Sequence, residues 1–131
     1  MLANSKAFSG FAVDDLDRAR AFYADTLGLK VEPIEGAPLM TLHLAGDRPT
    51  LIYAKPDHTP ADYTILNFPV DDIDAAVDGL TERGVQLLRY DGFDQDERGI
   101  SRTPDGPPIA WFADPAGNLL AVLEDPRDAA A

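Results

Sequence analysis

The sequence offers few side chains that could transfer a proton near neutral pH, and His43 is the most suitable of them. It alternates with Leu42 and Leu44 in the apolar run 39–45, so its side chain faces away from theirs, into either a cavity or solvent. An imidazole titrates close to neutral pH. His43 is therefore either a general base or a half-exposed structural residue of a strand.

The other candidates for acid–base chemistry are Tyr53, at the end of an apolar run, and Asp91, in an irregular polar stretch. A phenol or a carboxylate beside a ligand can act as an acid or a base. His58 lies between Asp57 and Asp62 in a linker. These three groups could hold an adventitious ion, but a solvated loop is the simpler interpretation.

Two further residues could orient a ligand without reacting with it. Asn67 shares one face of its predicted strand with Ile65 and Pro69, and the opposite, more apolar face must pack against helices. We therefore expect the Asn67 amide on the cavity side. Trp111 lies in the apolar run 107–113, where an indole either packs in the core or lines a cavity.

These residues are positioned by two copies of one pattern. FAVDDLDRA at 11–19 aligns with FPVDDIDAA at 68–76, and apolar residues at spacings of three and four then predict helices over 15–27 and 72–83. Aspartates at a helix start accept backbone N–H bonds and favour the positive end of the dipole, so these acids cap rather than catalyse. The expected C-cap residues are Gly28 and Gly84.

Short runs with strand composition follow each helix, which together with a strand before each helix predicts eight principal strands. The runs are 29–34, 39–45 and 50–55 in the first copy, and 85–90, 107–113 and 119–124 in the second. Asp-Pro-Ala-Gly-Asn at 114–118 predicts the turn between the last two.

The irregular stretch 91–106 is either a lid or a solvated connection, with one short strand around 99–102. At its start, Tyr90 and Asp91 either contact a ligand or lie in solvent. The linker 55–62 separates the copies, and the tail 125–131 is expected to be frayed.

Composition limits the classes of function. The chain has 131 residues, 45% of them hydrophobic, which suits a single domain. Eleven basic against 23 acidic residues give a net charge of −12, which argues against nucleic acid and anionic membranes as partners. There is no cysteine for disulfides or zinc–thiolate sites, and no signal-like or membrane-spanning stretch. We expect a cytoplasmic protein.

The segments VDDLDRARAFYADTLGL, VDDIDAAVDGLTERGV and FADPAGNLLAVLE resemble the vicinal oxygen chelate superfamily of glyoxalases, extradiol dioxygenases and bleomycin-resistance proteins. The resemblance implies an α+β fold of two βαβββ modules, about residues 6–56 and 62–124, whose curled mixed sheets surround a cleft. It also implies a homodimer. Fold alone does not give function, because members of this superfamily include both enzymes and binding proteins.

The resemblance further implies metal ligands at four positions, which in this chain hold Phe8, Tyr53, Ile65 and Ala121. Only a phenol among these could bind a cation, whereas a divalent metal needs several N or O donors. Shifting the last strand by three residues would bring Glu124 into place, at the exposed end of that strand. We therefore expect neither a metal nor another cofactor.

The sequence thus favours a metal-free protein that binds a small aromatic or cationic molecule, with drug or metabolite sequestration as the concrete form. The expected ligand-binding residues are Phe8, His43, Tyr53, Ile65, Asn67, Trp111 and Ala121. A rival is a metal-independent lyase, isomerase or hydrolase that uses His43, Tyr53 or Asp91. A third hypothesis is a regulatory module that keeps only the fold.

Overall fold

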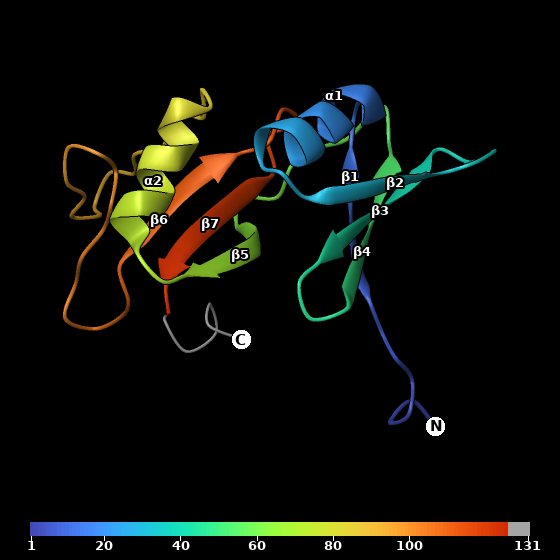
Figure 1. Ribbon diagram of the computed structural model, residues 1–131, viewed down its shortest axis with the longest axis horizontal. Helices are drawn as coiled ribbons and strands as arrows, with labels where there is room; N and C mark the ends of the chain where they lie inside the picture. The colour runs from blue at the N-terminus through green and yellow to red at the C-terminus, as the bar shows by residue number, and fades with distance from the viewer. Residues whose placement is uncertain (126–131) are drawn as a thin grey trace. The chain divides into compact units, whose positions relative to one another are not determined.

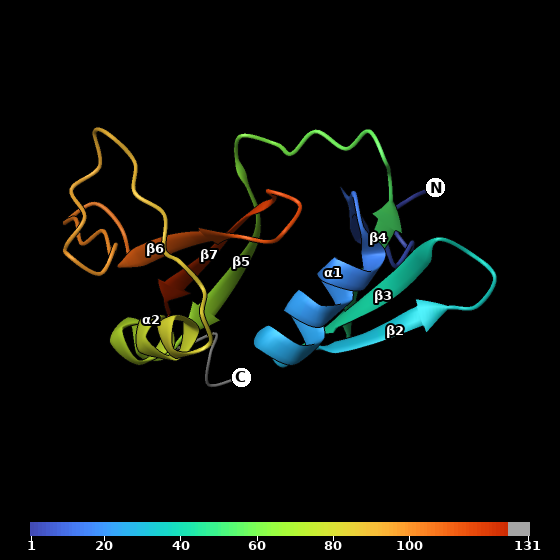
Figure 2. The same ribbon diagram turned by 90° about the horizontal axis from the view of Figure 1, so that it is seen from above.

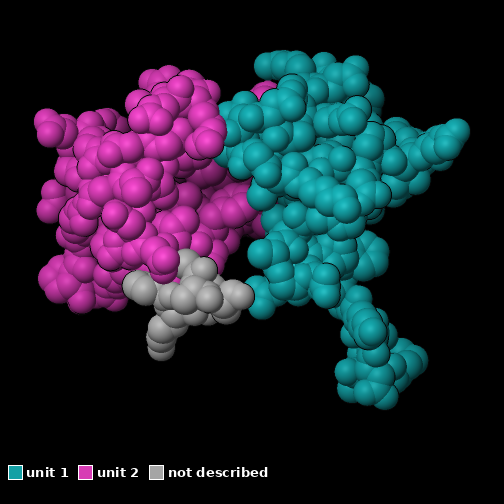
Figure 3. All heavy atoms as spheres, in the orientation of Figure 1, with its two compact units in different colours: residues 1–59 teal, residues 60–131 magenta. Residues whose placement is uncertain are grey.

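The computed structural model describes residues 1–125 and divides into two compact units, the first over residues 1–59 and the second from residue 60 onward. Figure 3 shows the units as spheres in two colours. Among residues 1–125, no helix is both long and apolar enough to cross a membrane. Apart from Asp125, the predicted tail lies outside the described residues.

Helices and strands follow one another as expected for an α+β fold, which confirms the predicted fold class (Figure 1). In chain order they are β1 (Ser9–Val13), α1 (Leu16–Arg20), the π-helical segment η1 (Ala21–Thr26), β2 (Lys30–Ile34), β3 (Leu39–Leu44), β4 (Arg48–Ala54), β5 (Thr64–Val70), α2 (Ile73–Glu82), β6 (Ile109–Ala113) and β7 (Leu119–Glu124). The first predicted helix is therefore one run of two hydrogen-bonding types, α1 followed by η1.

The helix starts and ends confirm the prediction from the repeated pattern. Asp15 and Asp72 are the N-cap residues of α1 and α2, and each carboxylate accepts a bond from the backbone amide three residues later, at 3.1 and 3.2 Å. Beyond the helix ends, Gly28 and Gly84 have φ values of +76° and +84°. Glycine adopts this left-handed conformation without the Cβ penalty of other residues.

The first sheet has the order β1-β4-β3-β2, in which β1 runs parallel to β4 and the other pairs are antiparallel. One face packs against the helical run: the rings of Phe11 on β1 and Tyr23 on η1 lie 5.7 Å apart, and Tyr23 is fully buried. Met40, Leu42 and Ile52 are buried on the same face by strand alternation. The other face of this sheet is therefore free of its own helices.

The second sheet repeats the plan with one strand fewer. Its order is β5-β7-β6, in which β5 runs parallel to β7 and β6 antiparallel to it. Helix α2 lies against one face (Figure 2) and buries Ile73, Val77 and Leu80. In each unit, the first strand, which precedes the helix, thus pairs in parallel with the last strand of that unit.

The prediction of a strand over 85–90 is wrong: this range, all of it described, is irregular, and seven strands rather than eight form within residues 1–125. The Leu88 amide donates to the Trp111 carbonyl at 2.8 Å. The hydrogen-bond partners of the Leu88 carbonyl and of the Tyr90 amide, however, belong to the side chain of Gln95. The Gln95 amide oxygen accepts from the Tyr90 backbone at 2.8 Å, and its nitrogen donates to the Leu88 carbonyl at 2.9 Å. One glutamine thus provides the hydrogen bonds that a strand partner would supply.

The short strand expected around 99–102 is reduced to bridges at a single residue. Ser101 pairs with Gln95 and with Ile109, through backbone bonds of 2.8 and 3.1 Å to Ile109. This pairing attaches the irregular stretch to the outer edge of β6.

The turn between β6 and β7 forms as predicted from its residue types. One oxygen of the Asp114 carboxylate accepts from the backbone amides of Ala116 and Asn118, both at 2.9 Å, and the other accepts from the Asn118 side chain. Gly117 has a φ of +89°. Buried Asp114 and Asn118 therefore fix the register of β6 against β7.

Candidate functional site

Three of the predicted ligand-binding residues, Phe8, His43 and Tyr53, belong to the face of the first sheet that its helices leave free. Phe8 directly precedes β1 and alternates with Gly10 and Ala12, and Ala12 is paired with Tyr53. Phe8 is 64% exposed and Tyr53 39% exposed. Both rings could therefore contact a ligand.

Because Gly10 has no side chain, the backbone between Phe8 and Tyr53 is not covered on this face. It pairs with Leu51, and a Cβ atom at Gly10 would lie 3.1 Å from the Leu51 carbonyl oxygen and 3.3 Å from its Cβ. Such contacts are too tight for most side chains. The two rings thus lie on either side of a stretch where backbone is close to the surface.

His43 lies on the same face, at the edge formed by β2 and β3. Its Nε2 atom is 2.9 Å from Glu32 Oε1, in an ion-pair contact rather than an aligned hydrogen bond, and Lys30 Nζ is 3.3 Å from the same oxygen. The Lys30 ammonium, and secondarily His43, lowers the pKa of the Glu32 carboxyl. His43 is thus 40% exposed and sits beside an ionised carboxylate.

The second sheet aligns three other predicted residues in one row. Ala121 on β7 pairs with Asn67 on one side and with Trp111 on the other. Leu120 and Val122 alternate with Ala121, so the row lies on the face opposite α2. Asn67 is exposed, Trp111 half-buried and Ala121 fully buried.

Ile65 does not join this row. The pairing of β5 with β7 shifts between Thr64 and Leu66, so Ile65 stands at an irregularity without a register partner. It is half-buried there. The predicted common face of Ile65 and Asn67 is thus interrupted by a bulge.

A cluster of three rings, which we call the aromatic triad, gathers at Trp111. Its ring centroid lies 5.5 Å from that of Tyr90 and 5.2 Å from that of Phe93, and the Tyr90 and Phe93 centroids are 6.0 Å apart. The interplanar angles, 87°, 59° and 64°, correspond to edge-to-face and tilted contacts rather than stacking. Phe93 remains 56% exposed.

An ion-pair cluster fastens the segment that carries Tyr90 and Phe93 to helix α2. Arg98 Nη1 donates to Asp74 Oδ1 at 2.6 Å, and Arg98 Nη2 donates to the Asp74 carbonyl at 2.8 Å and to Asp78 Oδ1. Arg102 Nη2 donates to the same Asp74 oxygen at 2.7 Å. We call these four residues the Arg98 latch, and residues 90–102 the latched segment.

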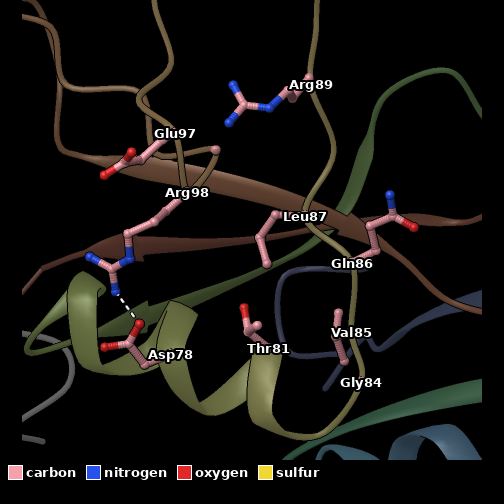
Figure 4. A pocket seen from close by; sticks show the side chains of 10 residues that line it. Asp78, Thr81, Gly84, Val85, Gln86, Leu87, Arg89, Glu97 and Arg98 are labelled. Atoms are coloured by element: carbon pink, nitrogen blue, oxygen red, sulfur yellow. Dashed lines mark hydrogen bonds and ion pairs between the residues drawn. The ribbon is translucent and has the colours of Figure 1, made fainter.

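A cavity of about 480 Å³ lies beside this latch (Figure 4). Its walls come from α2, from the segment that follows α2 and from the latched segment, and Arg98 reaches across to Asp78 at one side. The residues that line it are Asp78, Thr81, Gly84, Val85, Gln86, Leu87, Arg89, Glu97, Arg98 and Gly99. The latched segment is thus separated from part of α2 by open space, which the latch crosses.

The side chains at the four positions of the family's metal do not fit a metal site. Phe8, Ile65 and Ala121 bring no donor atom, and within residues 1–125 no three His, Cys, Asp or Glu gather as metal ligands. The alternative ligand, Glu124, has a structural partner: its Oε2 accepts the backbone N–H of Ile73 at 3.0 Å, at the start of α2.

Sequence reasoning missed Phe93, Gln95 and the latch. Phe93 stands alone among acidic residues, without the apolar periodicity that marks a core or wall residue. One signal was present for the latch: Asp74 and Asp78 are spaced four apart on a helix, and so are Arg98 and Arg102 in the stretch that follows. Matching spacings of opposite charge indicate a possible pairing.

Comparisons with known proteins agree on one family. The family model described as Glyoxalase/Bleomycin resistance protein/Dioxygenase superfamily matches residues 7–122 of this chain. A glyoxylase-like domain-containing protein from Didymella fabae is 28% identical over 119 residues, which cover 86% of this chain and 87% of that protein.

Solved structures show the same fold. A glyoxalase/bleomycin resistance protein from Catenulispora acidiphila has a TM-score of 0.65 and 26% identity, covering 92% of this chain and 97% of that one. TnmS3, an antibiotic binding protein from a Streptomyces species, has a TM-score of 0.66 and 24% identity, with the same two coverages. At that identity the second likeness concerns the fold alone.

Proposed function

This chain belongs to the glyoxalase/bleomycin resistance protein/dioxygenase superfamily, and from that premise we propose that it binds a small, largely apolar or aromatic molecule without a metal and without converting it. Sequestration of a drug or metabolite is the concrete form. The observation that carries this proposal is the row Asn67–Ala121–Trp111 with the aromatic triad at its end. It combines apolar surface with one placed amide.

Ligand sites for small molecules are mostly apolar and carry few polar groups, which fix the ligand's orientation. The triad offers three rings, and the Asn67 amide offers both a donor and an acceptor. On the first sheet, the exposed residues Phe8 and Tyr53 flank the uncovered backbone at Gly10. Neither surface carries the set of nucleophile, base and orienting group that covalent catalysis needs.

Two further points support a binding role. A structural neighbour of similar size, TnmS3, is an antibiotic binding protein, so this fold is compatible with such a function. The net charge of −12 gives the chain a negative field, which would attract a cationic aromatic ligand more than an anionic one. A positive charge over the faces of Phe8 or Tyr53 would add cation–π attraction of roughly 0.5–2 kcal/mol.

The test is a screen of planar natural products by thermal shift, followed by Trp111 emission and mass spectrometry. A ligand at about 100 times its Kd should stabilise the fold by roughly 2.7 kcal/mol. Trp111 is the single tryptophan, so a change in its emission locates the ligand near the triad. Asn67→Ala should weaken the hits, whereas Asn4→Ala, in the segment before β1, should leave them unchanged. Recovery of every hit chemically unaltered is the expected result, and turnover would overturn the proposal.

A second candidate function rests on the contact between His43 and Glu32. A carboxylate 2.9 Å from Nε2 can hold an imidazole in one orientation, which leaves Nδ1 to act as a base on a bound molecule. This arrangement favours a metal-independent lyase, isomerase or hydrolase. In that case His43→Gln abolishes product formation while the thermal shift by the same compound persists.

We also propose that the protein works in the cytoplasm as a homodimer. The edge strand β2 exposes backbone groups on one side, and pairing between subunits is a common way to cover such an edge. Light scattering at micromolar concentration tests this directly. A single species of about 14.2 kDa, the mass of one chain, would exclude the dimer.

A further inference from the structure

We infer that Phe93 is a movable ring that closes over Trp111 on a flat, polycyclic aromatic ligand, and that the Arg98 latch holds the segment in reach of that position. The inference rests on the proposed binding function and deepens it, because it names the class of ligand and the residue that retains it. It concerns the second unit alone.

The exposure of Phe93 is the first observation. The residue is 56% exposed although its ring already contacts those of Tyr90 and Trp111. An apolar ring in this state leaves area that a ligand can bury, at about 25 cal/mol per Å². Tyr63 of the same unit is 67% exposed and lies outside the aromatic triad, so it provides a matched control.

The backbone around Phe93 is built as a tight turn with a glycine next to the ring. The Phe93 amide donates to the Tyr90 carbonyl at 3.3 Å, and Gly92 has a φ of +88°. Because glycine has no Cβ, the turn can change its backbone angles at this position at low cost. Phe93 is thus carried on a short turn that can adjust.

The rest of the segment is anchored on both sides of the turn. Gln95 binds the backbone of Tyr90, Leu88 and Gly99 through its side chain, at 2.8, 2.9 and 2.8 Å. Further on, the Arg98 latch joins the segment to α2, across the cavity of about 480 Å³. Ile100 of this segment is buried and the Ser101 backbone pairs with Ile109, so the latch acts together with these contacts in setting where the segment lies.

The ring geometry points to a flat ligand. Trp111 and Phe93 are tilted by 59° at 5.2 Å, whereas a planar ring held between two others needs the outer rings about 7 Å apart, twice a stacking distance of roughly 3.5 Å. Phe93 must therefore move by about 2 Å to admit such a ligand. That displacement is within reach of a turn next to a glycine and of a change of side-chain rotamer.

The test uses acridine as a planar probe, at a pH where it is neutral, with stopped-flow mixing followed by Trp111 emission. We expect Phe93→Ala to weaken binding about five- to tenfold, mostly through a faster koff with kon changed less than twofold, because the closing ring retains the probe rather than attracting it. Phe93→Leu should regain less than half of the affinity that Phe93→Ala loses, since leucine restores apolar area without a ring face. Tyr63→Ala should match the wild type.

The possible outcomes separate this inference from the function on which it rests. Equal koff values for the wild type and Phe93→Ala, or failure of acridine to bind the wild type, would overturn the role of Phe93. The binding function itself falls if no compound of the natural-product screen binds or if the compounds that bind are turned over. Melting temperatures of all variants guard against a folding defect, and the exposure of both substituted rings makes such a defect small.

Discussion

The guanidinium of Arg98 reaches back from an irregular segment to the first turn of α2, where its Nη1 donates to the Asp74 carboxylate at 2.6 Å. The same carboxylate accepts from Arg102, so one aspartate holds two arginines that are four residues apart. Asp74 stands in the Asp-Asp-x-Asp pattern that both halves of the chain share. In the first half the corresponding acid, Asp17, lies in the first turn of α1.

The first prediction concerns the Arg98 latch. Arg98→Gln should raise amide hydrogen exchange of residues 90–102 by a factor of roughly two to five, since exposed ion pairs have modest strength, while the amides of β7 keep their protection. Lys55→Gln removes a different exposed ion pair, with Asp57, and should leave the latched segment unchanged. Uniformly faster exchange across the sheet would contradict a local role.

The second prediction is a pH dependence of the latch. Hydrogen bonding from Arg102, with Arg98 beside it, lowers the pKa of Asp74 below its ordinary value of 3.8. A carboxyl whose folded pKa is lowered contributes its full stability above the ordinary value and loses it as the pH falls through the lower, folded value. The emission of Trp111 should therefore stay constant from neutral pH down to about 4 and change below 3.8.

Substitution identifies the group responsible for this acid step. Asp74→Asn should remove it, because the neutral amide no longer titrates. Asp57 is a fitting control, since a hydrogen bond from Lys55 lowers the pKa of Asp57 as well. If Asp57→Asn rather than Asp74→Asn removes the step in Trp111 emission, the assignment to the latch is wrong.

The third prediction concerns Gln95, which replaces a strand partner. Gln95→Ala leaves the backbone groups of Leu88, Tyr90 and Gly99 without their partners, at a cost of about 1–3 kcal/mol for a part-buried group left unsatisfied. Urea denaturation measures this loss. Gln95→Glu keeps the acceptor for Tyr90 but places a carboxylate oxygen against the carbonyls of Leu88 and Gly99, so it should lose at least as much stability as Gln95→Ala.

The fourth prediction uses two glycines of the irregular stretch. Gly99 has a φ of +88°, and an added Cβ would lie 3.1 Å from Leu87 Cβ, so Gly99→Ala should destabilise the protein by about 1–2 kcal/mol. Gly106 has open space around an added Cβ and no positive φ. Gly106→Ala should change the urea midpoint by less than the error of the fit, and comparable losses for both variants would argue against this account.

The sequence was informative wherever local chemistry determines local structure. Asp15 and Asp72 cap helices because a short carboxylate reaches the backbone amides of the first turn, and that requirement is visible in the letters. The same holds for the turn at 114–118, in which Asp114 binds its own backbone neighbours. Asn67 could be assigned to a sheet face by alternation, whereas Phe8 and Tyr53 were identified only through the family resemblance, and the role of all three in binding stays a prediction.

The sequence was misleading where a distant side chain takes over a backbone partner. Residues 85–90 have strand composition, but Gln95 satisfies Leu88 and Tyr90 from outside any regular element, and no periodicity announces such a contact. Phe93 escaped notice for a related reason, because its partner Trp111 is reached through a turn among acidic residues. Contacts of this kind depend on the path of the chain rather than on its local pattern.

The difference between the two halves at the missing strand has an evolutionary consequence. In the first half, β2 is paired with β3 along its whole length, so each substitution there must respect the alternation of faces. The corresponding stretch of the second half is released from that constraint, and its neighbour 90–102 is joined to the rest of its unit by a few side chains and by the pairing of Ser101 with Ile109. Descendants of this protein could therefore exchange this one stretch, and with it the molecules they recognise, while inheriting both sheets unchanged.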